Sequence, residues 1–151
     1  GRVKRIRNYV GDEPFMLTYG DGLSTVNLNE LEKFHRSHGK TATITTVNMA
    51  QLKGVLEVNE NNEITSFREK DENDGALING GFMMLNPEVF SYIEGDETAF
   101  EKEPMAGLLR DGQLMSFYHD GFWQCMDTQR EMQKLNELWD SGKAPWKIWK
   151  D

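Results

Sequence analysis

The stretch FMLTYGDG, residues Phe15–Gly22, decides the predicted fold of this chain. It opens with an apolar run, Phe15–Leu17, without polar alternation. Such a run is typical of a strand buried on both faces, although a buried helix segment gives the same pattern. The glycines on either side of Asp21 let the backbone turn sharply and leave the carboxylate uncrowded. Because ligands of open α/β sheets bind just beyond the carboxyl ends of strands, Asp21 is a candidate metal ligand. An ordinary turn that uses Asp for its turn chemistry is the commoner explanation of such a residue.

The residues after this stretch predict a helix and a second strand. Asn27 is a suitable N-cap, Glu30 occupies the reciprocal capping-box position, and Gly39 is a natural helix end. The β-branched segment Lys40–Val47 follows and is typical of a strand. Strand, helix and strand in this order form a βαβ unit, which predicts a sheet that is at least partly parallel.

Further along the chain, the pattern adds a hairpin, more strands and more helices. The alternating segments Gly54–Val58 and Glu63–Arg68 predict the hairpin, and hence an antiparallel edge or flap on the sheet. We expect strands over Ala76–Asn86 and Gln113–Tyr118, and helical segments over Pro87–Ile93, over Thr98–Arg110 in two pieces, and over Gln129–Asp140. The predicted fold class is therefore α/β, with a mixed, mostly parallel sheet flanked by helices.

Two pairs of residues have competing explanations. His35 and His38 lie near the end of the predicted helix, where solvated cations that interact with the helix dipole are commoner than metal ligands. Gly80 and Gly81 lie inside a predicted strand, which glycine weakens unless another group must approach the backbone closely. A β-bulge explains the two glycines equally well.

The composition narrows the function classes. The chain has 151 residues, 38% hydrophobic and 28% charged, which suits one soluble globular domain with a core. No apolar run approaches the roughly 20 residues of a membrane span, and no signal peptide opens the sequence. The single cysteine, Cys125, suits a reducing cytoplasm. A net charge of -8 without a large basic cluster argues against a nucleic-acid partner, and the lack of a long apolar run argues against a membrane partner. An acidic protein that handles phosphates needs a cation or a local Lys or Arg.

Candidate polar residues lie at three places along the predicted sheet. They are Asp21, then Glu69 and Lys70 with Asn79 and Gly80, then Asp127. If the strands bring these places to one crevice, the two aspartates could hold one divalent ion, since Mg²⁺ takes one or two carboxylates plus substrate phosphates. Lys70 would supply a positive charge for a phosphate, although a solvated loop lysine is its simpler explanation. The Asn79 amide and the bare backbone beside it suit contacts with hydroxyl groups.

Five short motifs stand out from the rest of the chain. They are TYGDG (Thr18–Gly22), HG (His38–Gly39), INGGF (Ile78–Phe82), GFWQ with MDT (Gly121–Thr128) and SGKAPWKIW (Ser141–Trp149). In their order and spacing, the chain resembles the sugar-nucleotide pyrophosphorylase family of nucleotidyltransferases. INGGF, FWQ-x-MDT and KAPWK are typical of the cytidylyl branch of that family. The resemblance covers nearly the whole chain.

The resemblance implies a nucleotide-diphospho-sugar transferase-like, Rossmann-like fold. It also implies a reaction that joins CTP and glucose 1-phosphate to CDP-glucose, with release of pyrophosphate. By similarity, Asp21 and Asp127 hold Mg²⁺ and are catalytic together with Lys70, which contacts the sugar phosphate. The substrate-binding residues that the resemblance implies are Glu69, Lys70, Asn79 and Gly80.

The chain departs from the family pattern in its residues and in its extent. The family usually has Pro after its Glu-Lys pair and before Met126, where this chain has Asp71 and Cys125. Asp71 adds a negative charge beside Lys70. The Gly-rich loop of the family, which cradles the nucleotide phosphates and carries an Arg, has no match here. The resemblance therefore implies a C-terminal fragment that lacks the N-terminal nucleotide-binding half, has an incomplete fold and is inactive by itself.

Two other functions fit parts of the pattern. One is a stand-alone sugar-phosphate-binding or regulatory module. The other is a metal-dependent glycosyltransferase, which usually has an Asp-x-Asp pattern where this chain has Gly20-Asp21-Gly22. Because the opening strand of a fragment would expose an unpaired edge, we also expect a homo-oligomer.

Overall fold

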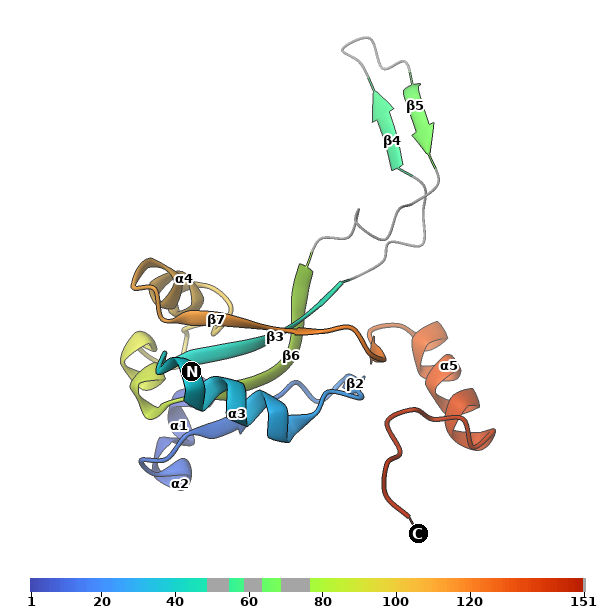
Figure 1. Cartoon of the computed structure of the whole chain (residues 1–151). Helices are drawn as coiled ribbons and strands as arrows, with labels where there is room; N and C mark the ends of the chain where they lie inside the picture. Colours follow the sequence, from blue (N-terminus) through green and yellow to red (C-terminus); the bar gives the residue numbers. More distant parts are fainter. Residues whose placement is uncertain (49–54, 59–63, 69–76, 151) are drawn as a thin grey trace.

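The computed structural model of the chain describes residues 1–48, 55–58, 64–68 and 77–150, and the side chains outside 49–76 and 151 (Figure 1). Its largest sheet has four strands in the order β1-β6-β3-β7. These strands are β1 (Phe15–Leu17), β6 (Leu77–Leu85), β3 (Ala42–Asn48) and β7 (Leu114–His119). β6 pairs antiparallel with both β1 and β3, and β3 pairs parallel with β7.

The sheet is mixed, as the sequence predicts, but the prediction that it is mostly parallel is wrong. β1, the helix α3 (Leu28–His38) and β3 do form a crossover, because β1 and β3 run in the same direction. β6, from much later in the chain, lies between them and runs against both. The βαβ pattern correctly indicates the relative direction of two strands, but it does not reveal which strand fills the gap between them.

Two further strand pairs are antiparallel. β2 (Gly22–Ser24) pairs with β8 (Trp123–Cys125), and this pairing joins two segments that are about one hundred residues apart in the sequence. β4 (Val55–Val58) pairs with β5 (Ile64–Arg68), which confirms the predicted hairpin over the residues that the structure describes. Its connecting turn lies outside the described residues.

The ends of the two longest helices follow from local sequence chemistry. The Asn27 side chain accepts hydrogen bonds from the backbone N–H groups of Asn29 and Glu30, and Gly39 ends α3 with φ of 63°. α5 (Gln129–Asp140) begins with a capping box between Thr128 and Glu131. The shorter helices are α1 (Arg2–Arg5), α2 (Arg7–Val10), the 3₁₀ helix η2 (Pro87–Tyr92) and α4 (Glu103–Arg110). None of the helices in the described ranges is long and apolar enough to cross a membrane.

The main core lies between the sheet and the segment from η2 to α4. Phe15 of β1 stacks on Phe90 of η2 with ring centroids 5.4 Å apart, and Leu85 and Leu108 are fully buried beside them. α3 packs on β3 and β6, whereas α5 and the C-terminal tail lie at the far end of the molecule from α4 (Figure 1). The apolar run that opens the fold is therefore a true strand, and its side chains anchor the core.

The expectation that His35 is a solvated cation is wrong. His35 is 2% exposed, and its ring nitrogens lie 2.8 Å from Thr43 Oγ1 and 3.0 Å from Asn86 Oδ1. His38 Nε2 lies 2.8 Å from the same Thr43 oxygen. The helix turns His35 inward on the same face as Leu31, so the imidazole joins three segments of the core through hydrogen bonds.

Candidate active site

A cavity of about 280 Å³ lies where β2, β6 and β8 come together. It is lined by Thr18, Tyr19, Asp21, Gly22, Ile78, Asn79, Gly80, Gly81, Trp123, Cys125 and Asp127. Four residues that the sequence singles out are thus brought together, namely Asp21, Asn79, Gly80 and Asp127. The other two, Glu69 and Lys70, lie outside the described residues.

The β2–β8 pairing brings the two aspartates to the same cavity. Gly22 lies opposite Cys125, and the Met126 backbone N–H donates to the Asp21 carbonyl oxygen at 2.9 Å. The next residue is Asp127, so both aspartates lie at the same end of the β2–β8 strand pair. Both side chains are exposed, which leaves their carboxylates accessible to a ligand.

Asp127 has two neighbours with metal-ligand chemistry. The ligand atoms of Cys125, Asp127 and Glu131 all lie within 4.8 Å of one another. However, the Glu131 Oε2 already accepts hydrogen bonds from the Asp127 and Thr128 backbone N–H groups, as part of the α5 cap. The Cys125 thiol donates to Asp127 Oδ2 at 3.1 Å. Burial, together with this hydrogen bond, raises the pKa of Cys125 to about 11, so the sulfur is a neutral thiol rather than a thiolate ligand at pH 7.

Among the residues that the structure describes, the carboxylates that line the cavity are Asp21 and Asp127. Both are oxygen donors, which is the donor type that Mg²⁺ requires, and both line the same cavity. The donor set fits a divalent cation of this kind.

The structure supports both explanations of the two glycines of β6, a β-bulge and the close approach of other groups to the backbone. The register of β3 against β6 shifts between Ile44 and Thr46, which is a β-bulge beside the glycines. Aromatic groups also approach the backbone closely. The Trp123 Nε1–H donates to the Gly80 carbonyl at 2.8 Å, and a Cβ on Gly81 would lie 2.8 Å from Tyr19 Cδ2. Gly81 has a φ of 90°, which favours glycine.

Tyr19 and Glu101 are site residues that sequence reasoning missed. The Tyr19 hydroxyl donates to Glu101 Oε1 at 2.9 Å and accepts from Asn79 Nδ2 at 3.2 Å. Burial and the Glu101 carboxylate raise the pKa of Tyr19 to about 12. Tyr19 lies inside the TYGDG motif, so the sequence could have indicated it, but Glu101 lies 82 residues away and has no such signal.

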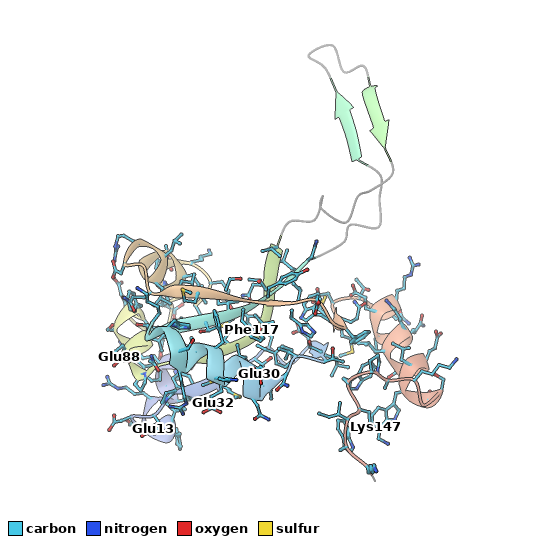
Figure 2. All side chains as sticks on the ribbon, in the orientation of Figure 1. Glu13, Glu30, Glu32, Glu88, Phe117 and Lys147 are labelled. Carbon is cyan, nitrogen blue, oxygen red and sulfur yellow. The ribbon has the colours of Figure 1, made fainter. Side chains whose placement is uncertain are left out.

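The C-terminal tail packs on α5 and on Phe122, the residue before β8. Trp146 lies against Phe122, and Lys147, labelled in Figure 2, has its Nζ 5.2 Å from the ring centroid of Trp139. Glu30 and Glu32 lie on the outer surface of α3 (Figure 2). Neither of these two carboxylates lines the cavity.

Known protein families match the chain over almost its full length. The nucleotidyl transferase family model matches residues 2–151. The chain is 47% identical over 150 residues to a glucose-1-phosphate cytidylyltransferase of Salmonella typhi, and 42% identical to a probable one of Bacillus subtilis. Each alignment covers 99% of this chain and 58% of the relative, so the chain spans little more than half the length of these relatives.

Solved structures of low sequence identity share the fold. A putative glucose-1-phosphate thymidylyltransferase from Bacillus anthracis superimposes with a TM-score of 0.67 at 16% identity, and covers 99% of this chain and 61% of that one. HddC from Yersinia pseudotuberculosis gives a TM-score of 0.61 at 17% identity, and covers 91% of this chain and 60% of that one.

The comparisons correct the prediction of a C-terminal fragment. What they support is a homologue of the cytidylyltransferases over residues 2–151, and the family model itself spans those residues.

Proposed function

Because the chain belongs to the nucleotidyl transferase family, we propose that it provides the sugar-phosphate-binding site of an enzyme that makes CDP-glucose from CTP and glucose 1-phosphate. The observation that carries this proposal is the single cavity lined by Asp21, Asn79, Gly80 and Asp127. The chain is related to glucose-1-phosphate cytidylyltransferase and covers part of that enzyme, so the activity of the whole protein is part of the proposal.

The proposed reaction is a phosphoryl-group substitution in which all atoms balance. A phosphate oxygen of glucose 1-phosphate attacks the α-phosphorus of CTP and forms the new P–O bond. The bond from that phosphorus to the oxygen that bridges to the β-phosphate breaks, and pyrophosphate leaves with the electron pair. Such a transfer depends mainly on holding the two reactants in line and on offsetting their negative charge.

Asp21 and Asp127 are the residues that we propose to hold Mg²⁺. When bound, the ion would offset the charge of the phosphates, which otherwise meet two carboxylates in a protein of net charge -8. The Cys125 thiol donates a hydrogen bond to Asp127 Oδ2, which helps to fix the rotamer of that carboxylate. Lys70 is proposed to contact the sugar phosphate and Glu69 the sugar, by the resemblance of their motif.

Asn79 and Gly80 are proposed to bind the hexose. An amide side chain presents both a donor and an acceptor, which is the pair that a sugar hydroxyl can engage. Gly80 brings bare backbone to the cavity. A side chain there would also crowd β3, because its Cβ would lie 3.1 Å from both the Thr45 carbonyl oxygen and Val47 Cγ1. The Trp123 indole, held by its bond to the Gly80 carbonyl, forms an apolar wall beside them.

Isothermal titration calorimetry of the purified chain with glucose 1-phosphate tests the site. We expect binding that requires Mg²⁺ and that is lost or weakened at least tenfold in Asp21→Asn and Asp127→Asn, which corresponds to about 1.4 kcal/mol or more. Asp140→Asn, at the exposed end of α5, removes the same charge far from the cavity and should bind as the parent does. Equal affinity in all these variants, or no binding by the parent chain, would contradict the proposal.

The same samples discriminate a second function, a stand-alone sugar-phosphate-binding module. That alternative needs only the cavity lined by Asp21, Asn79, Gly80 and Asp127. Pyrophosphate release is measured after CTP is added to the chain that is saturated with glucose 1-phosphate and Mg²⁺. Release supports the transferase reaction in this chain, whereas binding without release supports the module.

A further inference from the structure

We propose that Tyr19, held by Glu101, is a positioning residue that fixes the direction in which the Asn79 amide faces the cavity, and so contributes to the choice of sugar. This inference rests on the proposed function and deepens it. The three side chains come from the TYGDG segment, from β6 and from the loop before α4, so no local sequence pattern connects them.

The direction of each hydrogen bond in this network follows from the first acceptor. An ionised Glu101 carboxylate can only accept, so the Tyr19 hydroxyl proton points to Glu101 Oε1 at 2.9 Å. The Tyr19 oxygen then has lone pairs to offer, and Asn79 Nδ2 donates to it at 3.2 Å. The other end of the same amide is also set, because Asn79 Oδ1 accepts from the Gly81 N–H at 2.9 Å. Both ends therefore select the same orientation of the amide.

An amide in this orientation presents its donor and its acceptor to a sugar hydroxyl in a fixed direction. The two bonds use one amide proton and one lone pair, and within the described residues no hydrogen bond engages the second proton or the second lone pair of this cavity-lining residue. A flipped amide would exchange donor and acceptor there. A hexose hydroxyl placed for one arrangement would then meet the wrong partner, which is the kind of mismatch that separates epimers.

The position of the Tyr19 ring is itself constrained. Its Cδ2 lies 2.8 Å from where a Cβ of Gly81 would stand, so the ring lies directly on the Gly81 backbone. Tyr19→Phe keeps this contact and removes only the hydroxyl. The ring holds its place by packing, and the hydroxyl carries the orientation of Asn79.

The test uses the side-chain amide signals of Asn79 in the ¹⁵N-labelled chain, which Asn79→Asp identifies by their loss. In Tyr19→Phe and in Glu101→Gln we expect these signals to shift and to exchange faster with water. Matched controls are Tyr9→Phe, whose parent side chain is 89% exposed, and Glu97→Gln, which removes the same charge from an exposed position nearby. Both controls should leave the Asn79 signals in place.

A ligand measurement then separates positioning from a merely structural role. With Mg²⁺ present, Tyr19→Phe should bind glucose 1-phosphate roughly fivefold more weakly and should discriminate less against galactose 1-phosphate, its C4 epimer. Unchanged Asn79 signals in both variants would overturn the proposal, and so would changed signals with unchanged affinity and discrimination. If the parent chain binds no glucose 1-phosphate, the proposed function fails, and the Asn79 signals alone then decide whether Tyr19 and Glu101 orient this amide.

Discussion

Replacing Gly81 by alanine should destabilise the protein through two separable effects. The first is backbone strain, because Gly81 has a φ of 90°, where an L-residue costs about 1–2 kcal/mol. The second is overlap, because the new Cβ would lie 2.8 Å from Tyr19 Cδ2, and overpacking of this kind costs about 1–3 kcal/mol. Together they predict a loss of about 2–5 kcal/mol, a large part of the stability of an ordinary domain.

Urea unfolding followed by circular dichroism measures this loss, and two comparisons separate its causes. Gly142→Ala places alanine at a φ of 69° with nothing within 4 Å of the new Cβ, so it should show only the strain of about 1–2 kcal/mol. In a Tyr19→Ala background the overlap is removed, so Gly81→Ala should there cost no more than Gly142→Ala. The reasoning is refuted if Gly81→Ala is as mild as Gly142→Ala in the parent chain, or if its cost does not depend on Tyr19.

Three further predictions follow from other parts of the fold. Burial, with smaller contributions from His35 and Lys40, lowers the pKa of His38, so the folded state binds a proton there less readily than the unfolded state does. The free energy of unfolding should therefore keep its full value above pH 6.5, the ordinary pKa of histidine, and should fall as the pH drops below it. Urea midpoints at pH 7.5 and 5.5 check this, and the part due to His38 should vanish in His38→Gln. Thr128→Ala removes the α5 capping box and should cost about 1 kcal/mol, whereas Thr128→Ser should be nearly neutral, as measured by the same unfolding assay. The edge strand β1 pairs with one neighbour among the described strands and exposes Met16. Light scattering at micromolar concentration should therefore show a dimer or a larger species, and Met16→Lys should weaken this association. A parent chain that is only monomeric would contradict the prediction.

The local features of the helices could be predicted because they depend on residues within a few positions of one another. Asn27 and Thr128 accept hydrogen bonds from backbone groups at the start of their own helices, and Gly39 ends α3 in the left-handed region. The predicted bounds of the last helix agree with α5. The hairpin of β4 and β5 is likewise a contact between near neighbours in the sequence. In these segments, hydrogen-bonding groups and φ preferences of the chain itself select one structure.

The candidate site could be predicted in part. The motifs indicated Asp21, Asn79, Gly80 and Asp127, which line one cavity in the structure, and their roles stay predictions. Tyr19 and Glu101 were not identified, because an aromatic residue in a turn and an acid in a polar loop have many ordinary explanations. What sets them apart is tertiary: Tyr19 contacts Asn79, and Glu101 contacts Tyr19.

The sequence alone determined the bounds of α3 and α5, the approximate positions of β3, β6 and β7, and which residues carry polar chemistry. It did not identify β2 or β8, and of the two helical pieces predicted over Thr98–Arg110 the structure has an α-helix only at Glu103–Arg110. Tertiary structure alone decided that β6 lies between β1 and β3, that His35 faces inward, and that β2 and β8 bring Asp21 and Asp127 to one cavity. The physical reason is the range of the forces involved. Caps and turns act over three or four residues, whereas the neighbour of a strand is chosen by the apolar faces that the whole chain must bury together.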